Sequence, residues 1–229
     1  MPGCGKSQPK QPCKHQAHVE IKRVDENTKL ANKLYAHVGA GREGHATDPA
    51  AVTAGITADI DQWTWDEKTP DGLPTGDRHL LDFYIRGPSR AVVEHYLGEL
   101  ATQDPAFAIA ADHQLGFEHI TRSGKSDWRT YDLRAAPLLG EHDIAEAKPG
   151  TDPSTGRPLV TVELTAAGKQ RFAEVTRANA GHKLAFIVDG DISAAPIIVG
   201  QITGGTFTLF ADGPGEAAAL AAKLTCPGS

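Results

Sequence analysis

The segment Phe186–Gly205, FIVDGDISAAPIIVGQITGG, constrains the fold of this chain more than any other stretch. Residues 183–188 form an apolar run, Asp-Gly-Asp follows at 189–191, and a second apolar run occupies 193–201. Asp-Gly between two apolar runs is a strong β-hairpin signal, because Gly adopts a positive φ at no steric cost and Asp hydrogen-bonds its own backbone. The sequence therefore predicts that residues 183–188 fold back on residues 193–201.

The two carboxylates of this segment admit a second interpretation as an acidic metal site. A calcium loop would continue with further oxygen ligands at alternate positions, but Ile-Ser-Ala-Ala follows Asp191. The run at 13–18, CKHQAH, carries metal-capable side chains without a matching second pair. We therefore predict a turn at Asp189 and Gly190, and no metal site.

Short apolar periodicities elsewhere predict alternating strands and helices. Expected strands cover residues 19–24, 60–65, 79–86, 117–121, 131–133, 158–164 and 206–210, the first of them an edge strand because its apolar and charged residues alternate. Expected helices cover residues 27–38, a short stretch after 49, and residues 90–103, 165–179 and 215–224. In the helix at 165–179, Phe172, Val175 and Ala178 are expected to face inward. The pattern predicts an α+β fold with mixed or antiparallel sheets and helices packed on one face.

The chain has 229 residues, of which 40% are hydrophobic, enough for one large domain or two small ones. Turn-rich stretches at 68–77 and 149–156 read as a turn and as a boundary or long hairpin loop. We expect a polar disordered lead at 1–17, an α+β subdomain at 18–130 and a second subdomain at 131–229. A net charge of −6 argues against nucleic-acid binding, and no apolar run approaches the roughly 20 residues of a membrane helix.

The three cysteines, Cys4, Cys13 and Cys226, lie in the polar ends of the chain. Cys13 and Cys226 can pair if the termini meet. Gly-Cys-Gly at 3–5, followed by a polar tether, looks like the mature start of a bacterial lipoprotein, with Cys4 as the lipidation site. The alternative is an arbitrary flexible start, since no signal peptide is visible.

No local signature of catalysis is present in the sequence. There is no G-x-S-x-G elbow, and no Gly-rich loop follows a strand in the dinucleotide pattern. We therefore expect a protein without enzymatic activity and without a cofactor.

The C-terminal residues resemble a known family. The segment VTVELTAAGKQRFAEVTRANAGHKLAFIVDGDISAAPIIVGQITGGTFTL, at residues 160–209, resembles the head of the large extracytoplasmic (P1) domain of SecD, a subunit of the SecDF protein-export family. Its fold motif matches at Asp189, Gly190, Pro196, Gly204 and Gly205, and Tyr-Asp-Leu at 131–133 with Pro-Leu-Leu-Gly at 137–140 resembles the entry into the head. The strand–helix–strand unit at 79–121 looks like half of the family's base subdomain. Asp191 is a departure, since the family often has Lys there, and the family's membrane helices are missing.

This resemblance implies a non-enzymatic binding module outside the cytoplasm that contacts exported or unfolded polypeptide, or components of the Sec translocon. Capture would use groove contacts or strand addition. The expected polypeptide-binding residues are Asp191, Ser193, Gln201, Thr203 and Thr206. The alternative is a free-standing envelope lipoprotein with a structural or assembly role that kept the fold but lost translocation activity. Under either hypothesis, attachment to the membrane is expected only through an N-terminal lipid anchor or through missing transmembrane segments.

Overall fold

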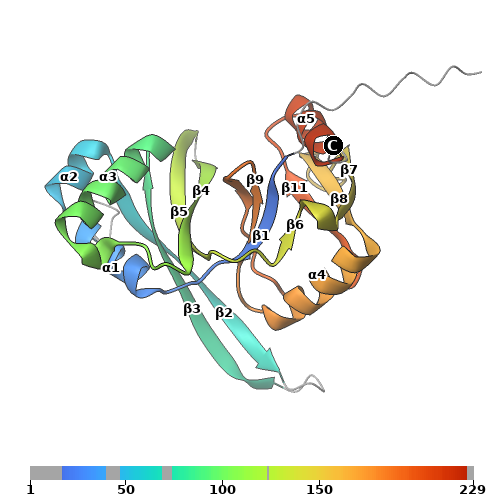
Figure 1. Ribbon diagram of the computed structural model, residues 1–229, viewed down its shortest axis with the longest axis horizontal. Helices are drawn as coiled ribbons and strands as arrows, with labels where there is room; N and C mark the ends of the chain where they lie inside the picture. The colour runs from blue at the N-terminus through green and yellow to red at the C-terminus, as the bar shows by residue number, and fades with distance from the viewer. Residues whose placement is uncertain (1–16, 40–46, 69–73, 123, 226–229) are drawn as a thin grey trace, which may run out of the picture.

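The computed structural model describes residues 17–39, 47–68, 74–122 and 124–225, which form two sheets and five α-helices (Figure 1). The strands are β1 (Val19–Arg23), β2 (Thr57–Lys68), β3 (Pro74–Gly87), β4 (His113–Arg122), β5 (Lys125–Arg134), β6 (Leu139–Gly140), β7 (Ile144–Thr151), β8 (Pro158–Leu164), β9 (Leu184–Val188), β10 (Asp191–Ala194) and β11 (Thr206–Phe210). The helices are α1 (Lys29–Val38), α2 (Pro49–Ala54), α3 (Arg90–Gln103), α4 (Ala166–Ala178) and α5 (Pro214–Thr225), with short 3₁₀ turns at Pro105–Phe107 and Glu141–Asp143.

The larger sheet has the strand order β2-β3-β5-β4-β10-β9-β1-β6, and the smaller sheet has the order β11-β8-β7. Neighbouring strands are antiparallel except β10 and β4, which run parallel. The mixed, mainly antiparallel sheets confirm the predicted α+β class. The hairpin β2–β3 is paired over twelve positions and extends away from the body of the molecule (Figure 1).

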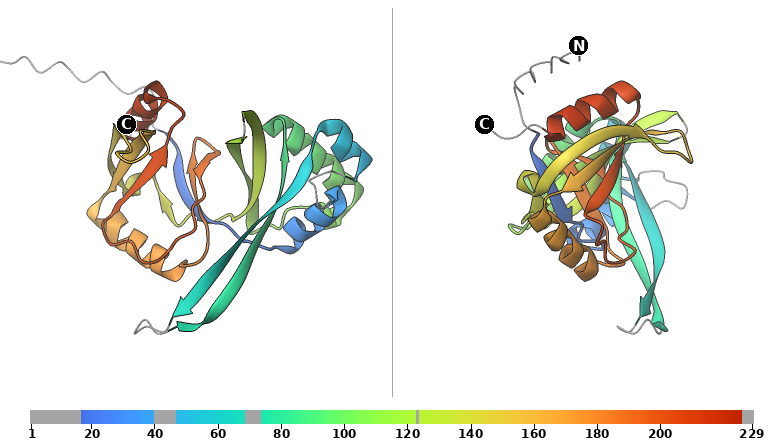
Figure 2. Two further views of the ribbon diagram at one scale, coloured as in Figure 1. Left: turned by 180° about the vertical axis from the view of Figure 1, so that it is seen from behind. Right: turned by 90° about the vertical axis from the view of Figure 1, so that its right-hand side faces the viewer.

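Helices α1, α2 and α3 cover one face of the sheet formed by β2, β3, β5 and β4, as Figure 2 shows. Each helix begins where a polar side chain accepts a backbone N–H of its first turn, from Thr28, Asp48 and Ser89 respectively. The apolar residues between helices and sheet include Ile56, Ile85 and others that are fully buried. This half therefore has a core of its own.

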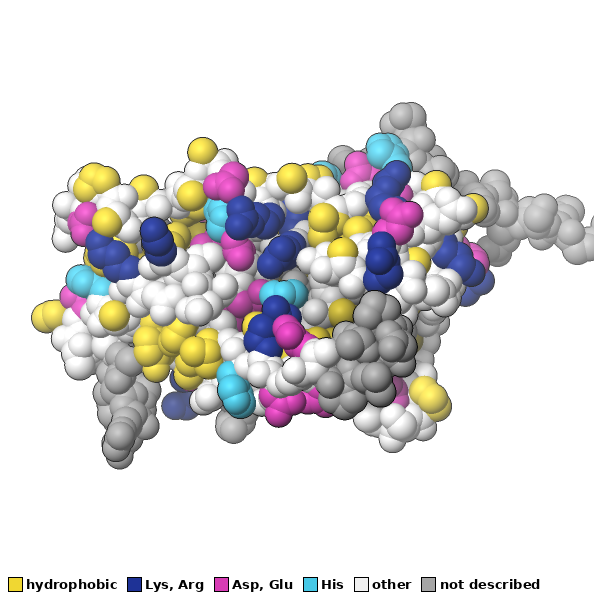
Figure 3. Space-filling view, turned by 90° about the horizontal axis from the view of Figure 1, so that it is seen from below, with side chains coloured by type: hydrophobic (Ala, Val, Ile, Leu, Met, Phe, Trp, Pro, Cys, Tyr) yellow, Lys and Arg dark blue, Asp and Glu magenta, His cyan; other side chains and the backbone are white. Residues whose placement is uncertain are grey.

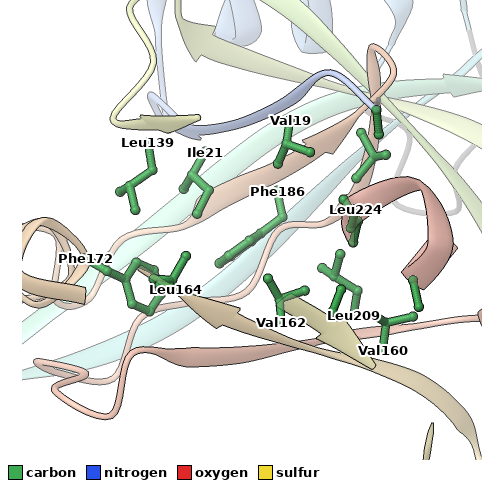
Figure 4. Close-up of a cluster of buried hydrophobic side chains, with 14 of the residues drawn as sticks. Val19, Ile21, Leu139, Val160, Val162, Leu164, Phe172, Phe186, Leu209 and Leu224 are labelled. Atoms are coloured by element: carbon green, nitrogen blue, oxygen red, sulfur yellow. The ribbon is translucent and has the colours of Figure 1, made fainter. Parts of the chain in front are cut away.

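A second core lies between β1, β9 and β6 of the larger sheet and the smaller sheet, closed by α4 and α5 (Figure 4). Phe172, Phe186 and Phe207 meet at its centre, with ring centroids 4.7 to 6.5 Å apart. Aromatic rings at these separations contribute beyond the apolar area that they bury. The packing joins the N-terminal strand β1 to elements more than 120 positions later in the sequence.

The prediction of an edge strand at 19–24 is wrong. β1 is paired on both sides, with β9 over five positions and with β6 over two. The alternating charge that suggested an edge is neutralised in place: Lys22, only 3% exposed, forms an ion pair with Glu20 at 2.9 Å and donates to Gln114 at 2.9 Å. A charged strand residue can therefore lie inside the sheet when its own strand supplies a counter-charge and another strand supplies a hydrogen-bond acceptor.

The prediction of a strand at 193–201 is also wrong for most of that range. β10 ends at Ala194, after a register shift between Ile192 and Ala194. The chain then follows the beginning of β9 through separate contacts, in which Leu184 donates to the carbonyl of Pro196 and Ile198 donates to that of His182. Pro196 has no N–H of its own, so a regular ladder cannot continue through it.

Other expectations are confirmed with small changes. The helix at 165–179 is present, but Ala178 is exposed and Thr176 is fully buried in its place, because the Thr176 hydroxyl donates to the carbonyl of Phe172 at 2.7 Å. The stretch at 149–156 belongs to a hairpin, since Thr151 pairs with Pro158. The turn expected at 68–77 is shorter, because its flanking strands reach Lys68 and Pro74. The division at residues 130 and 131 stays a prediction.

Candidate functional site

The turn between β9 and β10 is the one predicted from the sequence. Asp189 has φ 52° and Gly190 has φ 89°, while Val188 and Asp191 lie opposite each other. Two successive positive φ angles in a two-residue loop give the type I′ geometry that matches the twist of a hairpin. The paired carboxylates thus stand at the tip of a hairpin, and each has a partner of its own.

Asp189 connects the turn to the chain termini of the described region. Its carboxylate accepts from the Lys223 ammonium of α5 at 2.8 Å and from the backbone N–H of His18 at 3.1 Å, and its own N–H donates to the carbonyl of His18 at 2.8 Å. The hydrogen bond from Lys223 and the backbone N–H of His18 lower the pKa of Asp189, against the smaller opposing effect of partial burial.

Asp191 connects the same turn to the other half of the molecule. Its carboxylate forms an ion pair with the guanidinium of Arg90, the first residue of α3. Arg90 also bonds Glu94 at 2.8 Å and lies over the ring of Phe117, 4.9 Å from its centroid. The hydrogen bond to Glu94, and then that to Asp191, raise the pKa of Arg90. Asp191 therefore has a structural partner here that a Lys at this position would repel.

A groove of about 390 Å³ lies beside this turn, and we call it the hairpin groove. It is lined by β4, β5, the β9–β10 hairpin, the end of β11 and α5. Its apolar and aromatic lining consists of His119, Trp128, Val188, Ile192, Phe210, Ala211, Ala219 and Leu220. Its charged and hydroxyl lining consists of Asp189, Asp191, Ser193, Asp212, Glu216 and Lys223. The lining is thus divided about evenly between polar and apolar groups.

Aromatic side chains stand on both walls of the hairpin groove. His119 and Trp128 contact each other with ring centroids 5.3 Å apart. On the facing wall Phe210 is 42% exposed, and the guanidinium of Arg157 lies 4.4 Å from its ring centroid. Large exposed aromatic rings of this kind are typical of surfaces that bind another chain.

Strand β11 adds an open sheet edge to the groove. Within the described residues it pairs with β8 alone, and it is the outer strand of the smaller sheet. Thr206, Thr208 and Phe210 are exposed along it. An unpaired edge offers backbone N–H and C=O groups to an added strand.

The structure brings together only two of the five expected binding residues. Asp191 and Ser193 line the hairpin groove, whereas Gln201, Thr203 and Thr206 lie near the opposite end of β11 from Phe210. There Ile202 donates to the hydroxyl of Thr176, and Leu164 donates to the carbonyl of Gly205. Gly205, with φ 69°, would place a Cβ 2.7 Å from Lys169, so it serves the close approach of this loop to α4.

Sequence reasoning missed His119, Trp128, Phe210 and Leu220. They come from four separate elements, and only the tertiary packing places them around one groove. The available signal was the large aromatic ring at the end of a predicted strand, since Phe210 closes the run at 206–210.

A buried group of four charges joins the two halves. Lys183, next to β9, lies 2.7 Å from both Asp61 of β2 and Asp82 of β3. Arg129 of β5 reaches the same two carboxylates at 2.8 and 3.2 Å. The side chains of Lys183, Asp82 and Arg129 are 4% to 6% exposed. We call these four residues the charge cluster.

Aromatic rings enclose the charge cluster. The Arg129 guanidinium lies 3.6 Å from the ring centroid of Tyr84 and 4.2 Å from that of Tyr131, and the Lys183 ammonium lies 5.0 Å from that of Trp63. Burial raises the pKa of Asp82 against the opposing effect of Lys183, whereas the two cations lower the pKa of the more exposed Asp61 despite its partial burial. Each charge of the cluster has opposite charges within ion-pair distance, which is the arrangement that buried charges require.

The hairpin β2–β3 makes a further contact with the C-terminal half. Trp63 donates its indole N–H to the carbonyl of Gly181 at 3.0 Å. His182 bonds Glu26 at 2.9 Å through its Nδ1. Figure 3 shows the face seen from below, where acidic, basic and histidine side chains gather around the middle. The hydrogen bond of Trp63 holds the hairpin against the C-terminal half, whereas the bond between His182 and Glu26 joins that half to the segment after β1.

The expectations on Cys4, Cys13 and Cys226, and on the polar lead except for its last residue, fall outside the described residues; that last residue, Ala17, is buried. Among the residues that the structure does describe, no three His, Cys, Asp or Glu side chains are grouped to hold a metal ion. In the same ranges no helix combines the length and the hydropathy that a membrane span requires.

The chain is thus an α+β protein with a groove beside the β9–β10 hairpin. Residues 118–226 match the family model of the SecDF P1 head subdomain. This part of the chain is therefore similar to the SecDF P1 head subdomain, and it contains residues 160–209, which carry the resemblance in the sequence.

Curated relatives agree with this assignment. The chain is 45% identical over 69 residues to protein translocase subunit SecDF of Thermus thermophilus, a match covering 30% of this chain and 9% of that protein. It is 37% identical over 96 residues to protein translocase subunit SecD of Thermobaculum terrenum, covering 42% of this chain and 18% of that protein. The matches thus span less than a fifth of the length of either relative.

A solved chain from work on "a membrane component SecDF that enhances protein export" is also similar. The similarity covers 91% of this chain and 93% of that one, with 20% sequence identity and a TM-score of 0.39.

Proposed function

We propose that this chain is a non-enzymatic module that binds exported or unfolded polypeptide on the extracytoplasmic side of the cytoplasmic membrane, as part of Sec-type translocation. In this proposal residues 131–229 act as the head-like subdomain and residues 18–130 as the base-like subdomain. The support is that the head-like match contains a groove with exposed aromatic rings beside an unpaired strand edge.

The hairpin groove suits an extended polypeptide for two physical reasons. Apolar side chains of an unfolded segment can pack against Phe210 and Leu220, while its backbone can pair with the free edge of β11. Folded proteins keep their apolar side chains and backbone groups internally satisfied, so the groove distinguishes unfolded from folded chains. Ser193, at the groove wall, supplies a hydroxyl for polar contact.

The experiment that tests this proposal is a titration of the purified protein with a permanently unfolded polypeptide and with its folded counterpart. We expect saturable binding of the unfolded form only. Phe210→Ser should weaken it by about five- to thirtyfold, the effect of losing one to two kcal/mol at an aromatic anchor. Val52→Ser is the matched control, because Val52 is 59% exposed on α2 and lies outside the groove.

Two results would refute the proposal. One is equal binding of folded and unfolded forms. The other is an equal effect of Phe210→Ser and Val52→Ser, since the affinity would then come from general surface hydrophobicity.

A further inference from the structure

A second groove, of about 570 Å³, lies on the other side of Arg90, and we call it the α3 groove. It is lined by α3, by β4, by the connection between them and by α1. Its large apolar residues are Leu30, Leu97, Phe107, Ile109, Leu115 and Phe117. Ile109 is 44% exposed. Gly98 and Ala101 are the small residues on its α3 wall, and they leave the groove open on that side.

The two grooves lie on the same face of β4. Side chains alternate along a strand, so His113, Leu115, Phe117 and His119 share one face. The first three line the α3 groove and His119 lines the hairpin groove, where Trp128 is its cross-strand partner. From His113 to His119 there are six residue steps of about 3.4 Å each, so the path along β4 is about 20 Å long. This is the length of an extended segment of about six residues.

The ion pair between Arg90 and Asp191 stands at the junction of the two grooves. Arg90 lines the α3 groove and Asp191 lines the hairpin groove. The pair reaches across β4, because Arg90 lies over Phe117 and Asp191 precedes Ile192, which pairs with Glu118. The closed pair therefore divides the path at its centre.

This ion pair is suited to opening. Its side chains are 38% and 50% exposed, and exposed pairs contribute only about 0.2–1 kcal/mol. Arg90 keeps a second partner on its own helix, Glu94 at 2.8 Å, which can hold the guanidinium against α3 when Asp191 is released. Opening therefore breaks this exposed ion pair and a long hydrogen bond, 3.4 Å, from Arg90 to the carbonyl of Gly190, and it leaves Arg90 paired with Glu94.

We propose that the Arg90–Asp191 ion pair is a gate that divides one polypeptide-binding track into two grooves. Segments of about three residues occupy either groove with the gate closed, whereas apolar extended segments of six residues or more open it and occupy both. This inference rests on the proposed function, and it specifies the length and the apolar, extended character of the bound segment.

The test compares two uncharged peptides, both N-acetylated and C-amidated: the tripeptide Gly-Ser-Leu and a peptide of about nine residues with three repeats of that unit. Binding is followed by tryptophan fluorescence, because Trp128 lines the hairpin groove. Arg90→Gln, Asp191→Asn and the double variant are compared with the unaltered chain. Glu146→Gln is the matched control, because it removes the same charge as Asp191→Asn and breaks an exposed ion pair, with Lys148, that lies outside both grooves.

We expect each single variant to bind the longer peptide about two- to fivefold more tightly, which is the strength of the lost ion pair. The double variant should show the same gain in affinity as either single variant, because each substitution alone already removes the ion pair. The tripeptide affinity and the control variant should not change. Raising the salt concentration should strengthen binding of the longer peptide to the unaltered chain and have no such effect on the double variant.

Three results would each overturn the proposal that the ion pair is a gate. They are additive effects of the two substitutions, equal gains in affinity for both peptides, and a loss of affinity for the longer peptide. In all three cases peptide binding itself persists, so the proposed function stands. If neither peptide binds and Phe210→Ser has no effect on unfolded polypeptide, the proposed function fails and the gate fails with it.

Discussion

Replacing Lys183 by Met tests whether the charge cluster holds the two halves of the molecule together. The substitution keeps an unbranched side chain of similar length and removes one of two cations that face two carboxylates. Both hydrogen bonds of the ammonium, each 2.7 Å long, are lost. Arg129 is left as the partner of Asp61 and Asp82.

The expected cost follows from the burial of the cluster. Removing one partner of a buried ion pair costs about 3–5 kcal/mol, because a charge remains that neither water nor protein neutralises. Arg129 still contacts both carboxylates, so we expect the lower end, about 3 kcal/mol of unfolding free energy. For a chain of this size that lowers Tm by about 6–12 °C. It is a large part of the 5–15 kcal/mol typical of a folded protein.

The assay is urea and thermal denaturation followed by circular dichroism. The control is Lys148→Met, because Lys148 forms an ion pair with Glu146 of the same 2.7 Å length while its side chain is 66% exposed. That substitution should cost less than about 1 kcal/mol. The double variant Lys183→Met/Asp82→Asn should be more stable than Lys183→Met alone, since it also removes the uncompensated charge.

Acid should relieve the effect of Lys183→Met. Burial raises the folded-state pKa of Asp82 above 3.8, and Lys183 opposes that rise. Without Lys183 the folded-state pKa rises further, so stability is lost as pH increases from 3.8 through that pKa and is retained below it. The reasoning is refuted if Lys183→Met costs no more than Lys148→Met, or if the double variant shows the sum of the two single losses.

Three further substitutions test other parts of the structure by thermal denaturation. Gly116→Ala places a Cβ 2.5 Å from Ile192 and should lower the free energy of unfolding by about 1–3 kcal/mol. Gly98→Ala, whose Cβ would have no atom within 4 Å, should leave stability unchanged or raise it. Equal effects of the two substitutions would contradict the packing around Gly116. Thr176→Val leaves a backbone N–H without its acceptor and should cost about 1–3 kcal/mol, and a neutral result would mean that water replaces the hydroxyl. Asp189→Asn should lower stability slightly at pH 7. Because the folded-state pKa of Asp189 is lowered, the difference should shrink as pH falls from 3.8 and vanish below the folded-state pKa; a difference that persists there would exclude the ion pair as its cause.

The local elements of this protein follow from its sequence. The strands at 158–164 and 206–210 and the helix at 90–103 have the predicted bounds, because hydrophobic periodicity and capping residues act over a few neighbouring positions. The turn at Asp189 and Gly190 follows for the same reason, since two positive φ angles depend on those residues alone. The resemblance of residues 131–225 to the SecD head likewise rests on motifs within one continuous segment.

Only the tertiary structure decides what depends on distant partners. Lys22 and Lys183 are both buried. Lys22 pairs with Glu20 of its own strand and donates to Gln114 of β4, and Lys183 pairs with Asp61 of β2 and Asp82 of β3. The site depends on distant partners in the same way. Asp191 forms its ion pair with Arg90, which lies about a hundred positions away in the sequence. Phe210 and Trp128 line one groove only because the two sheets pack together. Short-range patterns fix the elements, whereas the electrostatic and packing partners that complete a site are chosen by the fold.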